Sequence, residues 1–366
     1  MTAGLSARAR EMVALWCALA SVGTCLVAAL ATMEPSGFKP SALVHIGSGD
    51  PLAPLAQAGA PGFAFSGGNH YDGEYYYAIA RDPLARGEEH RLIDRAAYRY
   101  GHPVLGFLGA LASLGSAPLV PVALLLAVLA CAGLAGWAGA RLAEDLGRSP
   151  WLGLSIALNP GIVLAASVVT SEAIGLAAIL LALWAWRRGK LGVALGALAV
   201  GCFAKESYVL VPVGIAVFEL VRRREGVARR VGLLALTPLP FVCWYAYVWA
   251  RFGTFPQSQA RDLTSAPFVG WLDTLHKAAA QHTAGFEAAQ LGMAAIPLIV
   301  VAGIALLVGA LRSLALATEV HPVFLLLAVT AFTLNWWNLL YPKDLLRALA
   351  VALALLPFTF ERRALA

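Results

Sequence analysis

Long apolar runs separated by short polar segments dominate this chain of 366 residues. A helix needs about 20 residues to cross the hydrocarbon core of a bilayer, and ten runs reach or approach that length. The runs cover residues 12–33, 118–140, 150–168, 171–187, 190–204, 207–221, 231–250, 291–311, 321–340 and 344–360. The pattern predicts an all-α polytopic membrane protein with about ten transmembrane helices, organised as a single integral membrane domain over residues 1–366.

The first run follows Arg8 and Arg10, which is also the arrangement of a signal peptide. The apolar region of a signal peptide has only about 7–15 residues and is followed by a small-residue cleavage site. The run 12–33 is longer than that, and many more apolar runs follow it. We therefore predict that the first helix is retained.

A shorter run, 102–115, is either an eleventh span or a helix that is interfacial or re-entrant. Cytoplasmic loops carry an excess of Lys and Arg, and this rule separates the two interpretations. With ten spans and a cytoplasmic N-terminus, the predicted cytoplasmic segments are basic, including 222–230 and Arg362 with Arg363. An eleventh span would export the basic segment 222–230. We therefore predict that 102–115 is interfacial or re-entrant.

The same orientation places both termini in the cytoplasm and two long segments on the outer face. These are residues 34–117, the first outer loop, and residues 251–290, the second outer loop. Polar residues are thus concentrated on the outer side of the cytoplasmic membrane, where we expect any active site. In the second outer loop, helical spacing of four apolar residues favours an interfacial helix over a site: Phe268, Trp271, Leu272 and Leu275.

Composition agrees with a membrane protein. The mean hydropathy is +0.72 and 13% of the residues are charged, against about 25% in soluble domains. The five cysteines lack CxxC or CxxH spacing, so neither a metal site nor a disulfide framework is predicted. The net charge of +6 lies mainly in loops between spans and does not indicate nucleic-acid binding.

The stretch NHYDGEYYYAIARDP, residues 69–83, is unusually polar and aromatic for this chain. A helix that begins at Asp72 has Asp72 as its N-cap, where the carboxylate accepts a backbone N–H. Asp72 is alternatively a general base at a membrane-facing cleft walled by tyrosines, and the two roles are compatible. The glycine at position 73 would let a substrate approach the backbone closely.

Three segments resemble the membrane glycosyltransferases of the GT-C class. They are YDGEYYYAIARDP, the following YRYGHPVLGFLGALASLG, and LNPGIVLAASVVTSEA, a proline-broken helix that ends in Ser-Glu. The last is similar to an element of the mannosyltransferase-like members, which include the GPI mannosyltransferases and bacterial relatives. The resemblance covers residues 10–360, with its short motifs in 69–116 and 159–206. One departure is His102, where the pattern leads us to expect an arginine before Pro103.

The resemblance implies a polyprenyl-phosphate sugar as donor and an acceptor hydroxyl outside the cytoplasm, in cell-envelope glycan assembly. Asp72 would accept the proton of the acceptor as its oxygen attacks the anomeric carbon. Phosphate is already a good leaving group and needs nearby cations rather than an acid. No cofactor is therefore expected, and no metal. The sugar, the acceptor and any partner beyond membrane lipids stay open.

Several residues are candidates for binding the donor phosphate or the substrate. A lysine at a membrane boundary can simply extend to the headgroups, and arginines of a long loop can be merely solvated, so these simpler interpretations remain open. Glu172, at the start of a predicted span, is a helix-dipole partner, a hydrogen-bonding group for sugar hydroxyls, or a support for Lys205. Lys343 and Arg347 are further cations. The predicted binding set is Lys205, Arg99, Arg81, Glu172, Tyr75, Tyr76, Tyr98 and His102.

Two other functions fit a chain with many spans. A transporter or lipid flippase would use intramembrane charges such as Glu172, Lys205 and Glu206 as a relay, and a non-catalytic scaffold would need no site. The charges cluster towards one face, and the two halves show no pairing of broken helices as in inverted-repeat transporters. We therefore predict a glycosyltransferase, with the transporter or flippase as the alternative.

Overall fold

The computed structural model describes residues 6–67, 70–223, 225–281 and 286–360. All regular elements within these ranges are helical, and their two isolated β-bridges join Gly47 to Ser66 and Thr264 to Leu334. The described residues contain no β-strand. The predicted all-α fold class is confirmed. Arg362 and Arg363, which were predicted to be cytoplasmic, lie outside the described residues.

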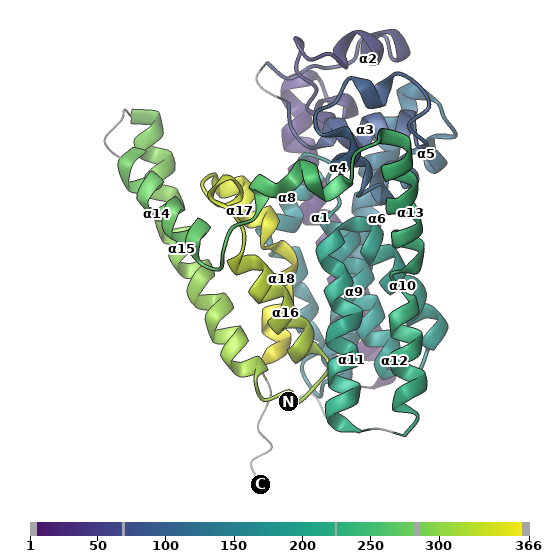
Figure 1. The fold of residues 1–366 in the computed structure, drawn as a ribbon, viewed down its shortest axis with the longest axis vertical. Coiled ribbons are helices and arrows are strands. Elements are labelled where there is room, and N and C mark those ends of the chain that lie inside the picture. Colours follow the sequence, from purple (N-terminus) through teal and green to yellow (C-terminus); the bar gives the residue numbers. More distant parts are fainter. Residues whose placement is uncertain (1–5, 68–69, 224, 282–285, 361–366) are drawn as a thin grey trace.

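A helix lies at each of the ten predicted spans (Figure 1). Seven spans correspond to one helix each: α1 (Ala7–Met33), α6 (Val120–Asp145), α9 (Glu172–Arg187), α10 (Leu191–Ala204), α11 (Leu210–Arg222), α15 (Phe286–Ser313) and α16 (Val320–Phe332). Three correspond to pairs: α7 (Leu154–Ala157) with α8 (Pro160–Ser167), α12 (Val227–Leu236) with α13 (Leu239–Phe252), and α17 (Pro342–Ala348) with α18 (Ala350–Leu355).

Length separates these helices into two groups. Four stretches are long and apolar enough to cross a membrane by themselves: Ala7–Ser36, Ala117–Asp145, Val227–Phe252 and Ala295–Ser313. The bent pair Pro150–Ala157 and Pro160–Ser167 would make a fifth. Helices such as α10 and α16, with 14 and 13 residues, are shorter than the roughly 20 residues of a span. The polytopic character is confirmed, whereas the count of ten spans stays a prediction.

The run 102–115 forms the short helix α5 (Val104–Ser113). Its ten residues extend about 15 Å, half the thickness of the hydrocarbon core. It packs against α3 (Gly73–Arg81) and α6. Gly106 lies against Ile79 of α3, where an added Cβ would come within 2.4 Å of that side chain. This helix is therefore too short to be an eleventh span and is held in place by the first loop.

The bundle has two chemically distinct ends (Figure 1). At one end, which we call the basic end, arginines join neighbouring helices: Arg10 to Glu144 at 3.1 Å, Arg187 to Glu319 at 2.9 Å, and Arg188 to Asp145 at 2.6 Å. The start of α1, the end of α11 and the start of α12 lie there, and α2 to α5 gather at the opposite end. We call that opposite end the pocket end. The predicted outer and cytoplasmic segments are thus segregated, although which side of a membrane each faces stays a prediction.

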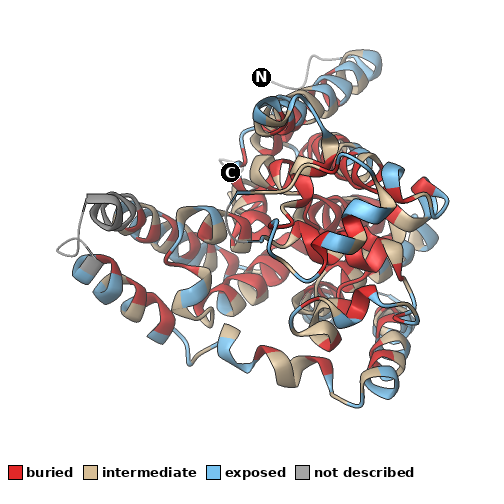
Figure 2. Ribbon diagram, turned by 90° about the horizontal axis from the view of Figure 1, so that it is seen from above, coloured by how far each residue is buried: buried red, intermediate tan, exposed pale blue. Residues whose placement is uncertain are grey.

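The outward faces of the long helices are apolar, and their inner contacts use small residues. On α1, Leu19 is 60% exposed and Val27 is 67% exposed, while Ser21 is fully buried. A Cβ on Gly136 of α6 would lie 2.6 Å from the carbonyl oxygen of Cys17, so a glycine is needed for this close approach. In Figure 2 the buried positions lie within the bundle and the exposed ones on its outer faces.

The first loop forms a cap of short helices at the pocket end (Figure 1). Between η2 (Pro40–Val44) and α5 these are α2 (Ala53–Gly59), α3, η3 (Glu89–Arg91) and α4 (Ala96–Tyr100). A Cβ on Gly73 would come within 2.7 Å of the carbonyl oxygens of both Val44 and Val168. Gly73 therefore lets α3 begin against two other backbone segments. The prediction that it lets a substrate approach the backbone is wrong.

The second outer loop contains the 3-10 helix η7 (Pro256–Leu263) and then α14 (Val269–Gln281), which packs against α15. Phe268 and Leu272 are 46% and 59% exposed, whereas Trp271 is buried and donates a hydrogen bond to the carbonyl of Ala331. The apolar exposed face agrees with an interfacial helix.

The predicted break at Asn159–Pro160 is present as a bend of 47° between α7 and α8. The Asn159 side chain caps α8 by accepting from the backbone N–H groups of Gly161 and Ile162, and it donates to the carbonyl of Ala350 at 2.9 Å. Gly161 packs so closely on α17 that a Cβ there would come within 2.2 Å of the carbonyl oxygen of Leu346. The bend thus fixes α8 against α17 and α18.

Candidate active site

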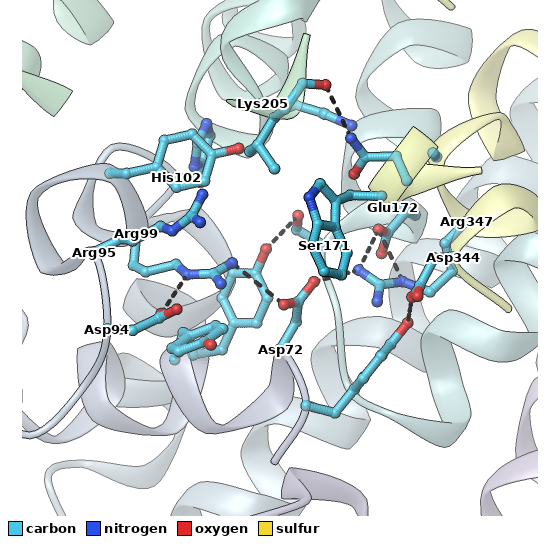
Figure 3. Close-up of a pocket in the computed structure, with 18 of the residues that line it drawn as sticks. Asp72, Asp94, Arg95, Arg99, His102, Ser171, Glu172, Lys205, Asp344 and Arg347 are labelled. Atoms are coloured by element: carbon cyan, nitrogen blue, oxygen red, sulfur yellow. Dashed lines mark hydrogen bonds and ion pairs between the residues drawn. The ribbon is translucent and has the colours of Figure 1, made fainter. Parts of the chain in front are cut away.

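A polar cavity of about 450 Å³ opens at the pocket end. It lies between α3 and α4 of the first loop and the pocket-end termini of α9, α10 and α17 (Figure 3). Of the nine residues predicted for the site, eight line it: Asp72, Tyr75, Tyr76, Tyr98, Arg99, His102, Glu172 and Lys205. Residues far apart in the sequence therefore converge on one site.

Asp72 lies directly before α3, at the N-cap position, but its side chain makes no capping hydrogen bond. The predicted capping interaction is therefore wrong. Instead the carboxylate accepts from Arg347 at 2.8 Å and from Arg99 at 3.3 Å. Burial favours the neutral acid, but the charges of Arg347 and Arg99 outweigh it and lower the pKa of Asp72 to about 2. Asp72 is thus an ionised carboxylate held between two guanidinium groups.

Arg347 links Asp72 to Glu172. Its guanidinium donates to Oε1 of Glu172 from Nη2 at 2.9 Å and from Nε at 3.2 Å, and only 9% of the residue is exposed. Glu172 opens α9, so it also lies where the helix dipole favours an acid. The direct partner of Glu172 is therefore an arginine of the site. Arg347 itself appeared in the sequence only as one cation among several.

Four tyrosines line the cavity, and three of them, Tyr75, Tyr76 and Tyr98, are each held by a specific contact. The guanidinium of Arg99 lies 3.6 Å from the centroid of the Tyr75 ring, a cation–π contact. The Tyr76 hydroxyl hydrogen-bonds the hydroxyl of Ser171 at 2.8 Å. The backbone N–H of Tyr98 donates to Gln259 of the second outer loop. The aromatic wall thus also positions the cation that holds Asp72.

Tyr71, directly before Asp72, connects the first loop to α17. Its hydroxyl donates to the carboxylate of Asp344. The ammonium of Lys343 lies 4.2 Å from the centroid of the Tyr71 ring. Lys343 is exposed and does not line the cavity, so it is a neighbour of the site and not part of it.

His102, where the resemblance led us to expect an arginine, pairs with a carboxylate. Its Nε2 contacts Glu206, which also accepts a hydrogen bond from Gln257 at 3.1 Å. The Tyr98 ring packs edge-on against His102 at 4.8 Å between centroids. His102 therefore ties the start of α5 to η6 (Glu206–Val209), and this pairing occupies its side chain.

Lys205 differs from the other cations of the cavity. Arg95, Arg99 and Arg347 are each ion-paired with a carboxylate. No ion pair or hydrogen bond joins the Lys205 ammonium to any residue that the structure describes, although its charge helps to lower the pKa of Asp72. The residue lies in an extended conformation between α10 and η6 (φ −162°, ψ 137°). The predicted cation is thus present in the cavity with its charge uncommitted.

Arg81 is the predicted site residue that the structure does not bring to the cavity. It lies at the end of α3, where its Nη1 donates to the carbonyl of Gly115 at 3.1 Å and its Nε lies 3.7 Å from Glu89. These contacts hold the end of α3 to the chain after α5. The predicted phosphate contact of Arg81 has no support in this geometry.

The wall opposite α3 was not anticipated. The second outer loop supplies Asp262 and Leu263, and η8 (Trp336–Asn338) supplies Trp337 and Asn338. Asp262 receives a bidentate pair from Arg95 at 2.8 and 2.9 Å, which joins the two outer loops. The Asn338 side chain donates to the carbonyl of Leu263. These residues follow irregular segments without a periodic pattern, so the sequence carried no signal that they would meet.

A second cavity of about 260 Å³ adjoins the first and shares five lining residues with it: Tyr98, Lys205, Leu263, Asn338 and Ala348. Its remaining lining comes from α16 and α18, which are mainly apolar here, and from η6 (Glu206–Val209) and the first part of the second outer loop, which include the polar Glu206, Gln257 and Arg261. The apolar members include Leu263, Leu327, Ala331, Leu334, Val351 and Ala352. Lys205 therefore lies where a strongly polar chamber meets a more apolar one.

One group of three potential metal ligands occurs among the described residues: Asp50, His70 and Glu74. None of the three lines either cavity. Within the larger cavity, Asp72 and Glu172 are both ion-paired with Arg347. These acids therefore act as partners of an arginine and not as a group of metal ligands.

No protein-family model matches the chain, and no curated protein matches it. Among solved structures, the crystal structure of ArnT from Cupriavidus metallidurans in the apo state is similar to it. The sequence identity is 19%, the similarity covers 78% of this chain and 72% of that one, and the TM-score is 0.36. A likeness of this extent does not indicate an activity for this chain.

Proposed function

We propose that this chain is a membrane glycosyltransferase of the GT-C type. It would move a sugar from a polyprenyl-phosphate sugar to an acceptor hydroxyl at the outer face of the cytoplasmic membrane, in cell-envelope glycan assembly. The observation that carries the proposal is the position of Lys205. Its uncommitted charge lies where the polar cavity meets the more apolar one.

A polyprenyl-phosphate sugar has three parts whose chemistry matches this arrangement. The phosphate suits the Lys205 ammonium, because a cation there offsets the charge that develops as the leaving group departs. The isoprenoid chain suits the side lined by α16 and α18, where Leu327 and Val351 lie. The sugar then occupies the polar cavity beside Asp72. Arg99 and Arg347 already hold Asp72, and a bound phosphate would compete with it for their hydrogen bonds.

The transfer step balances with the residues of the cavity. The acceptor oxygen forms a bond to the anomeric carbon, and the bond from that carbon to the phosphate oxygen breaks. The electron pair of the broken bond leaves with the polyprenyl phosphate, and the proton of the acceptor hydroxyl passes to Asp72. Lys205 stabilises the departing phosphate. In this scheme no metal ion takes part in the chemical step.

The alternative of a transporter or flippase finds less support. A relay across the bilayer needs ionisable groups near its middle. Helix α9 has Glu172 at the pocket end and Arg187 at the basic end with no charged residue between them, and α10 has none along its length. Charge is thus placed at the ends of these helices, which favours chemistry at one surface over passage between two.

Binding by the purified full-length protein in detergent micelles tests the donor class. The probes are a polyprenyl phosphate and the matching polyprenol. We expect the phosphate to bind more tightly, and Lys205→Ala to weaken its binding by at least about tenfold, the value of one hydrogen bond to a charged group. Lys343→Ala is the matched control, because Lys343 is at the same end but outside the cavity.

A panel of polyprenyl-phosphate hexoses and pentoses, with an envelope extract as acceptor, then tests the reaction through release of polyprenyl phosphate. Equal binding of polyprenol and polyprenyl phosphate would overturn the donor assignment. Transfer from a nucleotide sugar alone would overturn the reaction.

A further inference from the structure

Among the buried acids that the structure describes, Glu74 differs in accepting no hydrogen bond from a described residue. The described residues include five carboxylates whose residues are less than 9% exposed: Glu74, Asp82, Glu89, Glu219 and Glu319. The other four each accept a hydrogen bond from a described residue, as Asp82 does from the backbone N–H of Arg86 at 2.7 Å. No described residue donates one to Glu74, which is 4% exposed. A buried carboxylate without such a partner is costly.

The groups that face Glu74 are a histidine and a second acid. Nε2 of His70 lies 3.8 Å from its carboxylate, and Nδ1 of His70 lies 3.5 Å from Oδ1 of Asp50. One donor atom from each of the three residues can be chosen so that all lie within 4.8 Å of one another. No arginine or lysine of the described residues lies within 4 Å of Asp50 or Glu74. The two carboxylates therefore share one imidazole, and of the two only Asp50 also accepts a hydrogen bond from a described residue, the backbone N–H of Gly47.

We propose that Asp50, His70 and Glu74 bind a divalent transition-metal ion of the zinc class. Zinc binds imidazole nitrogen and carboxylate oxygen at about 2.0–2.2 Å, which places tetrahedral donors about 3.4 Å apart. The cluster reaches this spacing by a contraction of up to about 1.4 Å, and 42% of the His70 side chain is exposed, which leaves space for its ring to turn. The imidazole excludes Mg²⁺ and Ca²⁺ as preferred ions, because both favour all-oxygen ligands. A water molecule would complete the coordination.

The ion would connect the first loop to the helix that carries Asp72. Asp50 follows the backbone bridge between Gly47 and Ser66, while His70 and Glu74 lie on either side of Asp72. The His70 ring also packs edge-on against Tyr75, whose other contact is the Arg99 guanidinium. None of the three ligands lines the cavity. The metal is thus a positioning element for α3 and takes no part in transfer.

This inference does not depend on the proposed function, and it departs from the sequence prediction that no metal is bound. The spacing of 50, 70 and 74 matches no short metal motif. The two acids and the histidine meet because the loop folds back on the start of α3.

Metal content and metal binding of the full-length protein test the proposal. The purified protein is analysed by inductively coupled plasma mass spectrometry, then stripped with a chelator, and Zn²⁺, Mn²⁺ and Mg²⁺ are titrated calorimetrically. We expect one high-affinity Zn²⁺ site per chain, a higher unfolding temperature with Zn²⁺, and a much weaker response to Mg²⁺. His70→Ala, Asp50→Asn and Glu74→Gln should each weaken Zn²⁺ binding by at least about tenfold. His276→Ala, which removes an exposed histidine of α14, should leave it unchanged.

The competing state is a neutral Glu74. Burial, with the charges of Asp50 and Asp94, raises the pKa of Glu74 to about 8, so without an ion the carboxyl would hold a proton. Glu74→Gln imitates that neutral group at nearly the same size. Absence of Zn²⁺ binding in the unmodified protein, with Glu74→Gln equally stable, would overturn the proposal. Zn²⁺ binding that is the same in all three variants would overturn it too, since the ion would then lie elsewhere.

Discussion

The two ends of the helical bundle both contain arginine–carboxylate pairs, yet they differ in whether a cation of the cavity lacks a carboxylate partner. At the basic end, a cavity of about 240 Å³ is lined by Arg187 and Arg188, and each donates two hydrogen bonds to one carboxylate, Glu319 and Asp145 respectively. At the pocket end, Lys205 lacks such a partner among the described residues and adjoins a second, more apolar cavity. A dense set of ion pairs is therefore a structural device at both ends. We expect a ligand at the pocket end because Lys205 lacks such a carboxylate among the described residues.

Accessibility from the two sides of the membrane gives an all-or-none test of this comparison. In a background in which the exposed Cys243 is replaced by Ser, we would introduce Glu88→Cys or Ser258→Cys at the pocket end and Glu225→Cys at the basic end. An impermeant thiol reagent added to intact cells should label the first two and not the third, because positive loops stay inside. Labelling at position 225 would place the basic end outside and remove the outer-face site.

The largest effect on chemistry is expected at Asp72. Asp72→Asn keeps the shape of the side chain but removes the group that would accept the proton in the proposed reaction, so transfer should fall by at least about 10²-fold. Asp94→Asn is the matched control, since Asp94 also lines the cavity and also pairs with Arg99, but with 46% of its side chain exposed. Transfer rates with a polyprenyl-phosphate sugar would measure both. Near-normal activity of Asp72→Asn in folded protein would refute its role as the base.

A smaller effect is expected from filling the more apolar cavity. Ala352 lines that cavity and not the polar one. Ala352→Leu should weaken binding of a long polyprenyl phosphate by about tenfold, the usual cost of a misfit in an apolar pocket. A phosphate with only two isoprene units should be affected less, because it occupies less of the cavity. Equal losses for both probes would show that the chain does not lie along α16 and α18.

The smallest effect is expected at Arg81. Its contacts with Gly115 and Glu89 are structural, so Arg81→Ala should lower the free energy of unfolding by about 0.5–1.5 kcal/mol. Thermal unfolding in detergent would measure this change. Binding of polyprenyl phosphate should be unchanged, and a loss comparable to that of Lys205→Ala would return Arg81 to the site.

Apolar periodicity predicted the helices well, because burial in lipid or in a helical bundle leaves a direct mark on the sequence. It placed all ten helical regions, the break at Asn159–Pro160 and the short helix 104–113. It could not decide the spans, since α10 and α16 are shorter than a bilayer is thick. Whether an apolar helix spans the membrane depends on its tilt and on its packing against other helices, as well as on its composition.

The candidate site was predictable where a charged residue interrupts an apolar pattern. Glu172 and Lys205 were found in this way, Asp72 was found in a polar, aromatic stretch between apolar runs, and all three line the cavity. The specific pairs were not predictable, because the partners of Arg347 are 175 and 275 residues away in the sequence. Arg81 and Arg99 are both arginines of the first loop, and nothing in the sequence shows which one lines the cavity. The directions of α3 and α4 decide that Arg99 does and Arg81 does not.

The close packing of Gly161 on Leu346 gives α8 an influence on the cavity that it does not line. Arg347 directly follows Leu346. Because Gly161 has no side chain, α17 can lie close enough to α8 for the Arg347 guanidinium to reach Asp72. A methyl group added at position 161 has nowhere to go except into the backbone of α17. The absence of a side chain at Gly161 therefore fixes the distance between α8 and α17. A larger residue at this remote position would therefore displace Arg347 from Asp72, and we expect substitutions of Gly161 to be tolerated as poorly as substitutions of residues that line the cavity.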